Sequence, residues 1–196
     1  MTKIIGLTGG IGSGKTSIAK HIQSLGIPVY ISDDASKKIL ALPQTLQAIK
    51  QLFGAAVFEN EKLSREKLAK IVFNNSENLE KLNQIIHPAV KLDFQSWLVQ
   101  HKQAPLVVKE AAILFESGSY KDCDAIITVV APEAIRIQRV MERDKTDAQS
   151  VVNRINNQWT DAMRIAKSDF VIENTDFNKA VAKTDEILKK LMNQQK

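Results

Sequence analysis

The chain has 196 residues, of which 44% are hydrophobic, and it carries a net charge of +5 with a pI of about 9.2. This length favours one domain with inserted segments over two independent domains. The absence of any run of 18 apolar residues excludes a membrane-spanning helix, and the single cysteine, Cys123, excludes an internal disulfide. A lone cysteine and an early first strand without a signal-peptide segment lead us to expect a cytoplasmic protein.

A glycine-rich segment follows the first expected strand, residues 3–7. Residues 9–16 read Gly-Gly-Ile-Gly-Ser-Gly-Lys-Thr and match the pattern G-x-x-x-x-G-K-[ST]. Its glycines let consecutive backbone N–H groups wrap a polyphosphate, and a helix expected over residues 16–25 adds its positive dipole end. We therefore predict a nucleotide site in which Lys15 reaches the β- and γ-phosphates and Thr16 binds Mg²⁺. The alternative, a turn without a ligand, would spend the backbone entropy of four glycines for no purpose.

Two carboxylates follow the second expected strand, residues 28–31. Ligands of open α/β sheets bind beyond the carboxyl ends of the strands, so one of Asp33 and Asp34 is expected near the phosphate loop. The alternative is that they only cap the next helix. In an extended segment, neighbouring side chains point to opposite sides, so we expect Asp33 and Asp34 to have different roles.

Residues 35–102 contain no convincing strand. Helices are expected at 43–53, 65–73 and 76–102, with His87-Pro88 interrupting the last of them. The pattern predicts a helical insertion in the α/β core. Such an insertion could shape an acceptor site, although packing alone explains most of its residues.

The second half of the chain is expected to complete a parallel sheet. Its strands are predicted at residues 105–109, 124–130 and 169–172, and a closing amphipathic helix at 177–192. Glu110, at the end of the first of these strands, corresponds to the second carboxylate of phosphate-loop enzymes, which orders Mg²⁺ directly or through water.

The basic charge is concentrated in one part of the chain. Five of the six arginines fall within 29 residues, namely Arg136, Arg139, Arg143, Arg154 and Arg164. Acidic residues are interleaved with them, which suits a small polyphosphate better than a nucleic-acid duplex. A helix from Pro132 places the first three on one face. We expect a functional role for Arg143 and only a solvated helical face for Arg164.

Several motifs together resemble the dephospho-coenzyme A kinase family over nearly the whole chain. These motifs are Leu7 to Thr16, Ile86-His87-Pro88, Ile113 to Glu116, Arg139-x-x-x-Arg143-Asp144, Arg154-Ile155 with Gln158, and Asp169 to Asn174. The resemblance implies a three-layer α/β phosphate-loop kinase with a mainly parallel five-stranded sheet. It further implies a single domain, 1–196, whose parts are a core at 1–33, 104–138 and 169–196, a helical CoA-binding insertion at about 34–103, and an arginine-bearing lid at about 139–168.

The implied reaction moves the γ-phosphoryl group of ATP to the ribose 3′-hydroxyl of dephospho-CoA, the last step of coenzyme A synthesis. The resemblance implies catalytic roles for Asp33, Lys15 and Arg143. It also implies that Thr16 and Glu110 bind Mg²⁺. The implied nucleotide contacts are Gly10, Ile11, Gly12, Ser13, Gly14, Lys15, Thr16, Arg139 and Asn174. The implied substrate contacts are Asp33, His87, Leu114, Phe115, Arg154 and Gln158.

Two positions depart from the family pattern. The family commonly has Asp-Ala-Asp where this chain has Ile31-Ser32-Asp33, so only the second acid is retained, with Asp34 as an added neighbour. The family also often has Asp-Val-Pro-Leu-Leu where this chain has the segment from Glu110 to Leu114. The extra methylene of Glu110 leaves open whether it binds Mg²⁺ directly or through water.

Three other classes of function are alternatives to this reaction. A different small-molecule kinase, for a nucleoside or nucleotide, is the nearest alternative. A regulatory GTPase requires Asn-Lys-x-Asp, but Asn178-Lys179 is followed by Ala180-Val181. A nucleic-acid-binding module requires a one-sided basic stripe. We expect a small-molecule substrate, no nucleic-acid or membrane partner, and a monomer, with the oligomeric state left open.

Overall fold

The computed structural model describes residues 2–73 and 75–193, and these fall into two compact units. The first unit is formed by the chain up to Ile31 and from His101 onward. The second unit is Ser32–Gln100. Each unit has its own hydrophobic core and is described by itself.

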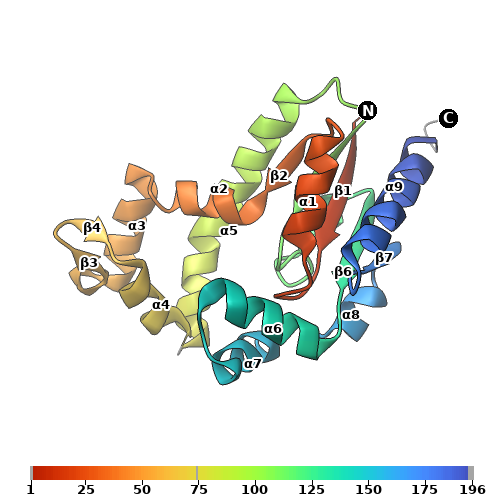
Figure 1. Cartoon of the computed structure of the whole chain (residues 1–196). Helices are drawn as coiled ribbons and strands as arrows, with labels where there is room; N and C mark the ends of the chain where they lie inside the picture. The colour runs from red at the N-terminus through yellow and green to blue at the C-terminus, as the bar shows by residue number, and fades with distance from the viewer. Residues whose placement is uncertain (1, 74, 194–196) are drawn as a thin grey trace. The chain divides into compact units, whose positions relative to one another are not determined.

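A five-stranded parallel sheet forms the centre of the first unit (Figure 1). Its strands, in spatial order, are β2 (Val29–Ile31), β5 (Leu106–Glu110), β1 (Lys3–Thr8), β6 (Ala125–Val130) and β7 (Phe170–Glu173). The register pairs Leu7 with Glu110 and Thr8 with Thr128, so β1 and β5 end within one residue of each other and β6 extends two residues beyond Thr128 at the same edge of the sheet. All five predicted strands are present within two residues of their expected bounds, and the predicted fold class is confirmed.

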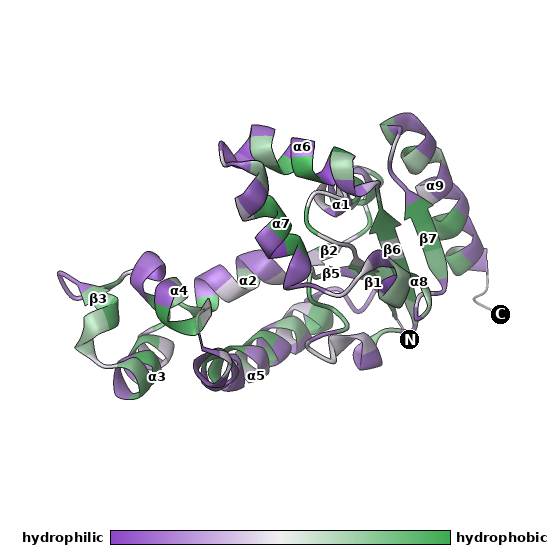
Figure 2. Cartoon of the chain, turned by 90° about the horizontal axis from the view of Figure 1, so that it is seen from below, coloured by the Kyte–Doolittle hydropathy of each residue, from purple (hydrophilic) through white to green (hydrophobic). Residues whose placement is uncertain are grey.

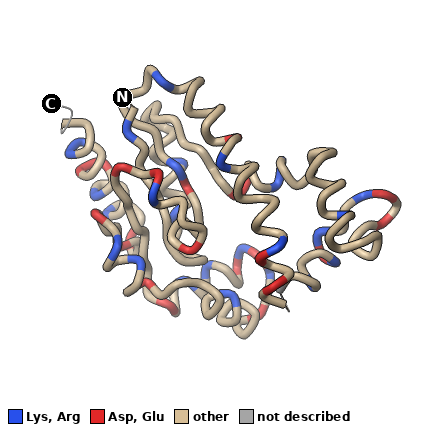
Figure 3. Tube along the Cα trace, turned by 180° about the vertical axis from the view of Figure 1, so that it is seen from behind, with Lys and Arg blue, Asp and Glu red and all other residues tan. Residues whose placement is uncertain are grey.

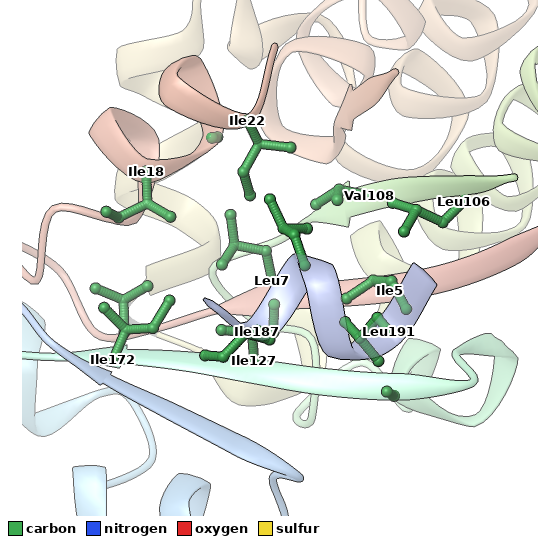
Figure 4. Close-up of a cluster of buried hydrophobic side chains, with 14 of the residues drawn as sticks. Ile5, Leu7, Ile18, Ile22, Leu106, Val108, Ile127, Ile172, Ile187 and Leu191 are labelled. Atoms are coloured by element: carbon green, nitrogen blue, oxygen red, sulfur yellow. The ribbon is translucent and has the colours of Figure 1, made fainter. Parts of the chain in front are cut away.

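Two helices cover one face of this sheet. They are α1 (Lys15–Ser24) and α9 (Phe177–Asn193), which also contact each other. Figure 4 shows Ile18 and Ile22 of α1 and Ile187 and Leu191 of α9 packed around Leu7 and its neighbours on the strands. Fully burying one such side chain contributes about 1.5–3 kcal/mol. Strands β6 and β7 are accordingly apolar in Figure 2, as expected for a parallel sheet covered by helices.

A second, smaller apolar cluster is formed by residues that follow β5 and by a residue of β6. Its buried members are Ala111, Leu114, Phe115 and Ile126, and the Phe115 ring stacks on Trp159 with centroids 5.4 Å apart. The remaining elements of this unit are η2 (Ser119–Asp122), α6 (Glu133–Asp144), α7 (Ala148–Asn156) and α8 (Asp161–Ile165). Cys123 is partly buried, and burial raises the pKa of its thiol to about 11.

The second unit is mainly helical. Its elements are α2 (Ser32–Ile39), α3 (Pro43–Phe53), η1 (Ala55–Val57), β3 (Phe58–Glu59), β4 (Lys62–Leu63), α4 (Arg65–Phe73) and α5 (Ser76–Gln100). α3 and α4 have the predicted bounds. The short antiparallel hairpin of β3 and β4 was not predicted, because its turn is Asn60-Glu61 rather than a glycine pair. Asn60 and Glu61 have positive φ values of 46° and 63°, as a two-residue hairpin turn of type I′ requires.

Two further expectations for this unit are wrong. Asp33 and Asp34 lie in the first turn of α2, not in an extended segment, because the helix begins directly after β2. α5 is not interrupted at His87-Pro88 but continues through Pro88 to Gln100. A proline removes one helical hydrogen bond, and we attribute the continuity to burial of Ile86 and Phe94 on either side.

Charged residues of both signs are interleaved along the helices of each unit (Figure 3). This is the mixed pattern that the positions of the arginines and acids predict. No helix within residues 2–73 and 75–193 combines the length and apolar character needed to cross a membrane.

Candidate active site

The glycine-rich loop joins the end of β1 to the start of α1, and it lies at the carboxyl-terminal edge of the sheet. Gly12 and Gly14 have φ values of 78° and 88°, which other residues adopt only with strain. A side chain on Gly14 would also collide with the amide of Asn174. Gly14 is the residue before α1, so the first amides of that helix point out of the loop without intrahelical acceptors. This geometry suits an anion.

Lys15 and Glu110 form an ion pair beside this loop. The Lys15 Nζ lies 3.3 Å from the Glu110 Oε1, and the two side chains are only 12% and 3% exposed. Glu110 reaches the loop because its strand pairs directly with β1. The buried carboxylate of Glu110 therefore pairs with Lys15, the lysine that is predicted to bind the phosphates.

The oxygen donors around Lys15 suit Mg²⁺. Thr16 is an exposed hydroxyl in the first turn of α1, and Glu110 supplies a carboxylate at the neighbouring strand end. Within the described part of the chain, no three His, Cys, Asp or Glu side chains gather as a metal site. Mg²⁺ in kinases needs no such cluster, because one or two protein oxygens and the substrate phosphates hold it.

A second group of polar residues borders the loop from α6 and from the end of β7. The Arg139 Nη2 donates to the Asn174 carbonyl at 2.9 Å, and the Asn174 Nδ2 donates to the Ser13 carbonyl at 2.8 Å. Three buried atoms in this group lack a hydrogen-bond partner: the Ser13 Oγ, the Arg139 Nη1 and the Asn174 Oδ1. Buried polar atoms are normally paired, so these three indicate a polar ligand at this side of the loop.

Arg136 is a loop contact that the sequence did not reveal. Its Nε donates to the Ile11 carbonyl at 2.9 Å, and the residue is 5% exposed. Gln158, which the resemblance assigns to the acceptor substrate, accepts the Ile11 N–H at 2.9 Å. The only hint for Arg136 was its position on the same helix face as Arg139.

The two outer arginines share one acid. Arg143 donates to both oxygens of Asp144, at 2.7 and 3.0 Å, and Arg154 donates to one of them at 2.7 Å. Hydrogen bonds from Arg143 and then Arg154 hold the pKa of the Asp144 carboxyl well below its usual range. The side chains of Arg143 and Arg154 are 60% and 50% exposed, so both remain accessible to a phosphate.

Arg164 does not lie on a solvated face, so that expectation is wrong. Its side chain is completely buried and lies 3.3 Å from both Glu116 and Asp161. Burial lowers the pKa of its guanidinium, and the two carboxylates oppose that shift. Hydrophobic spacing could not show this burial, because it depends on acids that approach from two different segments.

The predicted acceptor contacts are distributed over both units. Leu114 is fully buried and Phe115 nearly so, and both belong to the smaller apolar cluster. His87 is partly buried in α5, and burial lowers the pKa of its imidazole. Asp33 is exposed at the start of α2, whereas Asp34 pairs with Lys37 at 2.8 Å.

A phosphate loop after the central strand of a parallel sheet, with a paired lysine and arginines beside it, defines a phosphate-loop kinase. The chain belongs to the dephospho-CoA kinase family, whose model matches residues 3–179. A dephospho-CoA kinase of Fusobacterium nucleatum is 40% identical over 172 residues, which cover 87% of this chain and 89% of that relative. A dephospho-CoA kinase of Chlorobium chlorochromatii is 32% identical over 97% of this chain and 94% of its own.

Solved structures agree with this assignment. A crystal structure of a Thermus thermophilus protein has a TM-score of 0.88 at 31% identity, over 100% of this chain and 98% of that one. A dephospho-CoA kinase from Campylobacter jejuni has a TM-score of 0.73 at 23% identity, with both chains fully covered. A shikimate kinase from Acinetobacter baumannii, at 17% identity, has a TM-score of 0.56 over 100% of this chain and 97% of that one. The last two likenesses concern the fold alone.

Proposed function

We propose that this protein transfers the γ-phosphoryl group of ATP to the ribose 3′-hydroxyl of dephospho-CoA, giving coenzyme A and ADP. The observation that carries the proposal is the family match, which spans the phosphate loop, the Glu110 strand end and the arginines of α6 and α7. The names of the relatives favour dephospho-CoA over a nucleoside or nucleotide as the acceptor.

The phosphate end of the site works mainly by electrostatics. Lys15 and the first amides of α1 supply positive charge where the β- and γ-phosphates would lie. Thr16 and Glu110 would hold Mg²⁺, which supplies further positive charge to the phosphates when it is bound. Glu110 already pairs with Lys15, so it also fixes the position of the lysine before the nucleotide arrives.

Asp33 would act on the acceptor hydroxyl, and Arg143 would act on the phosphoryl group that is transferred. Asp33 would accept or orient the proton of the 3′-hydroxyl, and its exposed position at the start of α2 leaves the carboxylate accessible. Arg143 would leave its ion pair with Asp144 and bind the transferring phosphoryl group. Arg139 and Asn174 would contact the nucleotide. We assign His87 and Arg154 to the acceptor, with the second unit as its binding domain.

An assay of ADP release against a panel of acceptors tests this function. We expect activity with dephospho-CoA and none above background with AMP, adenosine or shikimate. The product with dephospho-CoA should carry its new phosphate on the ribose 3′-oxygen, as phosphorus NMR would show. Comparable turnover with AMP would instead favour a nucleotide kinase.

A further inference from the structure

One peptide group of the phosphate loop is held from both sides. The Ile11 N–H donates to the Gln158 Oε1 at 2.9 Å, and the Ile11 carbonyl accepts from the Arg136 Nε at 2.9 Å. Gln158 follows α7, and Arg136 lies in the first turn of α6. The two partners therefore come from the two ends of the segment that carries Arg143 and Arg154.

Arg136 is itself fixed in place. Its Nη1 lies 3.0 Å from the Asp161 Oδ2, and Asp161 also pairs with the buried Arg164. A side chain on Gly10 would collide with the Arg136 guanidinium, and one on Gly12 with the Arg136 backbone. The Arg136 backbone therefore leaves no room for a side chain at position 12, and the Arg136 guanidinium would have to shift to admit one at position 10.

Glu116 extends the same network to Gln158. It accepts from the buried Arg164 at 3.3 Å and from the Trp159 N–H at 3.1 Å. Trp159 is the residue after Gln158 and stacks on Phe115. The backbone next to Gln158 is thus anchored, and its side-chain oxygen is held toward the loop.

These contacts give Gln158 a role different from the acceptor contact that the motif implied. The Ile11 N–H donates to the Gln158 oxygen, so this backbone N–H is not directed at a phosphate. Fixing the Ile11 peptide restricts the backbone that leads to Gly12 and Gly14, and through them the orientation of the amides at the start of α1.

We propose that Gln158 and Arg136 are positioning residues that hold the Ile11 peptide in the conformation that binds the nucleotide phosphates. The proposal rests on the proposed function only in that the loop binds a nucleotide. It predicts that Gln158 affects nucleotide affinity and kcat, whereas an acceptor contact would affect the KM for dephospho-CoA.

Gln158→Met tests this assignment because it keeps the length of the side chain and removes the acceptor oxygen. Gln149→Met is the matched control, since Gln149 is exposed on α7 and its side chain donates to Asn153 of the same helix. We expect Gln158→Met to bind ADP with Mg²⁺ about tenfold more weakly in calorimetry, as follows from leaving a partly buried N–H unpaired. Exchange of the Ile11 amide with solvent should become faster, while the amides of β1 stay protected. The KM for dephospho-CoA should not change, and Gln149→Met should behave as wild type.

Gln158→Glu provides the second variant, because its carboxylate still accepts the Ile11 N–H. Protection of the Ile11 amide should persist in it. Wild-type ADP affinity and Ile11 protection in Gln158→Met, or a change confined to the KM for dephospho-CoA, would overturn the proposal. Because ADP binding and amide exchange need no acceptor, failure of the wild-type protein to phosphorylate dephospho-CoA would contradict only the proposed function.

Discussion

The arginines near the phosphate loop form two regions with opposite properties. Arg136 and Arg164 are buried and share the carboxylate of Asp161, and Arg164 also pairs with Glu116. Arg143 and Arg154 are exposed and share only Asp144. All four sit within 29 residues of sequence, yet one pair is built into the fold and the other remains exchangeable.

The difference follows from the cost of breaking each set of ion pairs. Removing one partner of a buried pair leaves an uncompensated charge and costs roughly 3–5 kcal/mol. An exposed pair contributes only about 0–1 kcal/mol, because water already solvates both charges. Arg143 can therefore leave Asp144 for a phosphate at little cost, whereas Arg136 and Arg164 cannot leave their partners.

The largest expected effect on stability is that of Arg164→Met. It leaves Glu116 and Asp161 partly unpaired beside an apolar side chain, so the free energy of unfolding should fall by about 3–5 kcal/mol. Urea denaturation measures this loss. Arg143→Ala is the comparison, with an expected change of less than about 1 kcal/mol. Equal losses in the two variants would remove the distinction between the regions.

Arg143→Ala should reverse that order for activity. An arginine that stabilises a phosphoryl-transfer transition state contributes roughly 10³-fold or more to kcat. We expect such a loss with the stability intact, and no loss in Lys145→Ala, which removes the exposed charge at the end of the same helix. Steady-state kinetics at saturating ATP and dephospho-CoA decide this. A change confined to the KM for ATP would show that Arg143 only binds the ground state.

Asp33 and Asp34 extend the comparison to acids. Both are exposed in the first turn of α2, but Asp34 pairs with Lys37, and the resemblance assigns Asp33 to the acid that the family retains. Asp33→Asn should lower kcat at least about a hundredfold, as expected for a positioned base. Asp34→Asn should leave kcat nearly unchanged. If Asp34→Asn is the inactive variant, the alignment at this strand end is wrong by one residue.

The smallest expected effect is the contribution of Asp144 to the pH dependence of stability. Its pKa is depressed in the folded protein, so its contribution to stability is present above its unfolded pKa of about 3.9 and is lost as the pH falls further. Because the site is exposed, Asp144→Asn should lower stability at neutral pH by less than about 1 kcal/mol. The difference from wild type should shrink below about pH 4 in urea titrations. A difference that grows with acid would contradict the assigned pairing.

The sequence predicts local features well and distant contacts poorly. The phosphate loop, the five strands and helices α3 and α4 follow from spacing and glycine placement within a few residues. The contact of Arg136 with Ile11 joins positions 125 residues apart, so no local pattern reveals it. The start of α2 and the continuity through Pro88 were missed because helix boundaries near Asp and Pro depend on packing as well as on propensity.

Burial caused the other differences. Leu114 and Phe115 lie in a motif that the resemblance assigns to the substrate, but their side chains belong to the core. Glu116, the last residue of that motif, anchors Arg164 and Trp159. A shared motif thus marks a position that matters, and the structure is needed to decide between a ligand contact and support for the fold.

Transfer of a labelled γ-phosphate tests the central claim most directly. Wild-type protein, ATP labelled at the γ-position and dephospho-CoA should give labelled coenzyme A within a single turnover. Lys15→Ala should give none while remaining folded, because the charge that holds the phosphates is missing. Lys20→Ala, on the exposed side of α1, should match the wild type. Label recovered only as free phosphate, or equal transfer by Lys15→Ala, would contradict a kinase reaction at this loop.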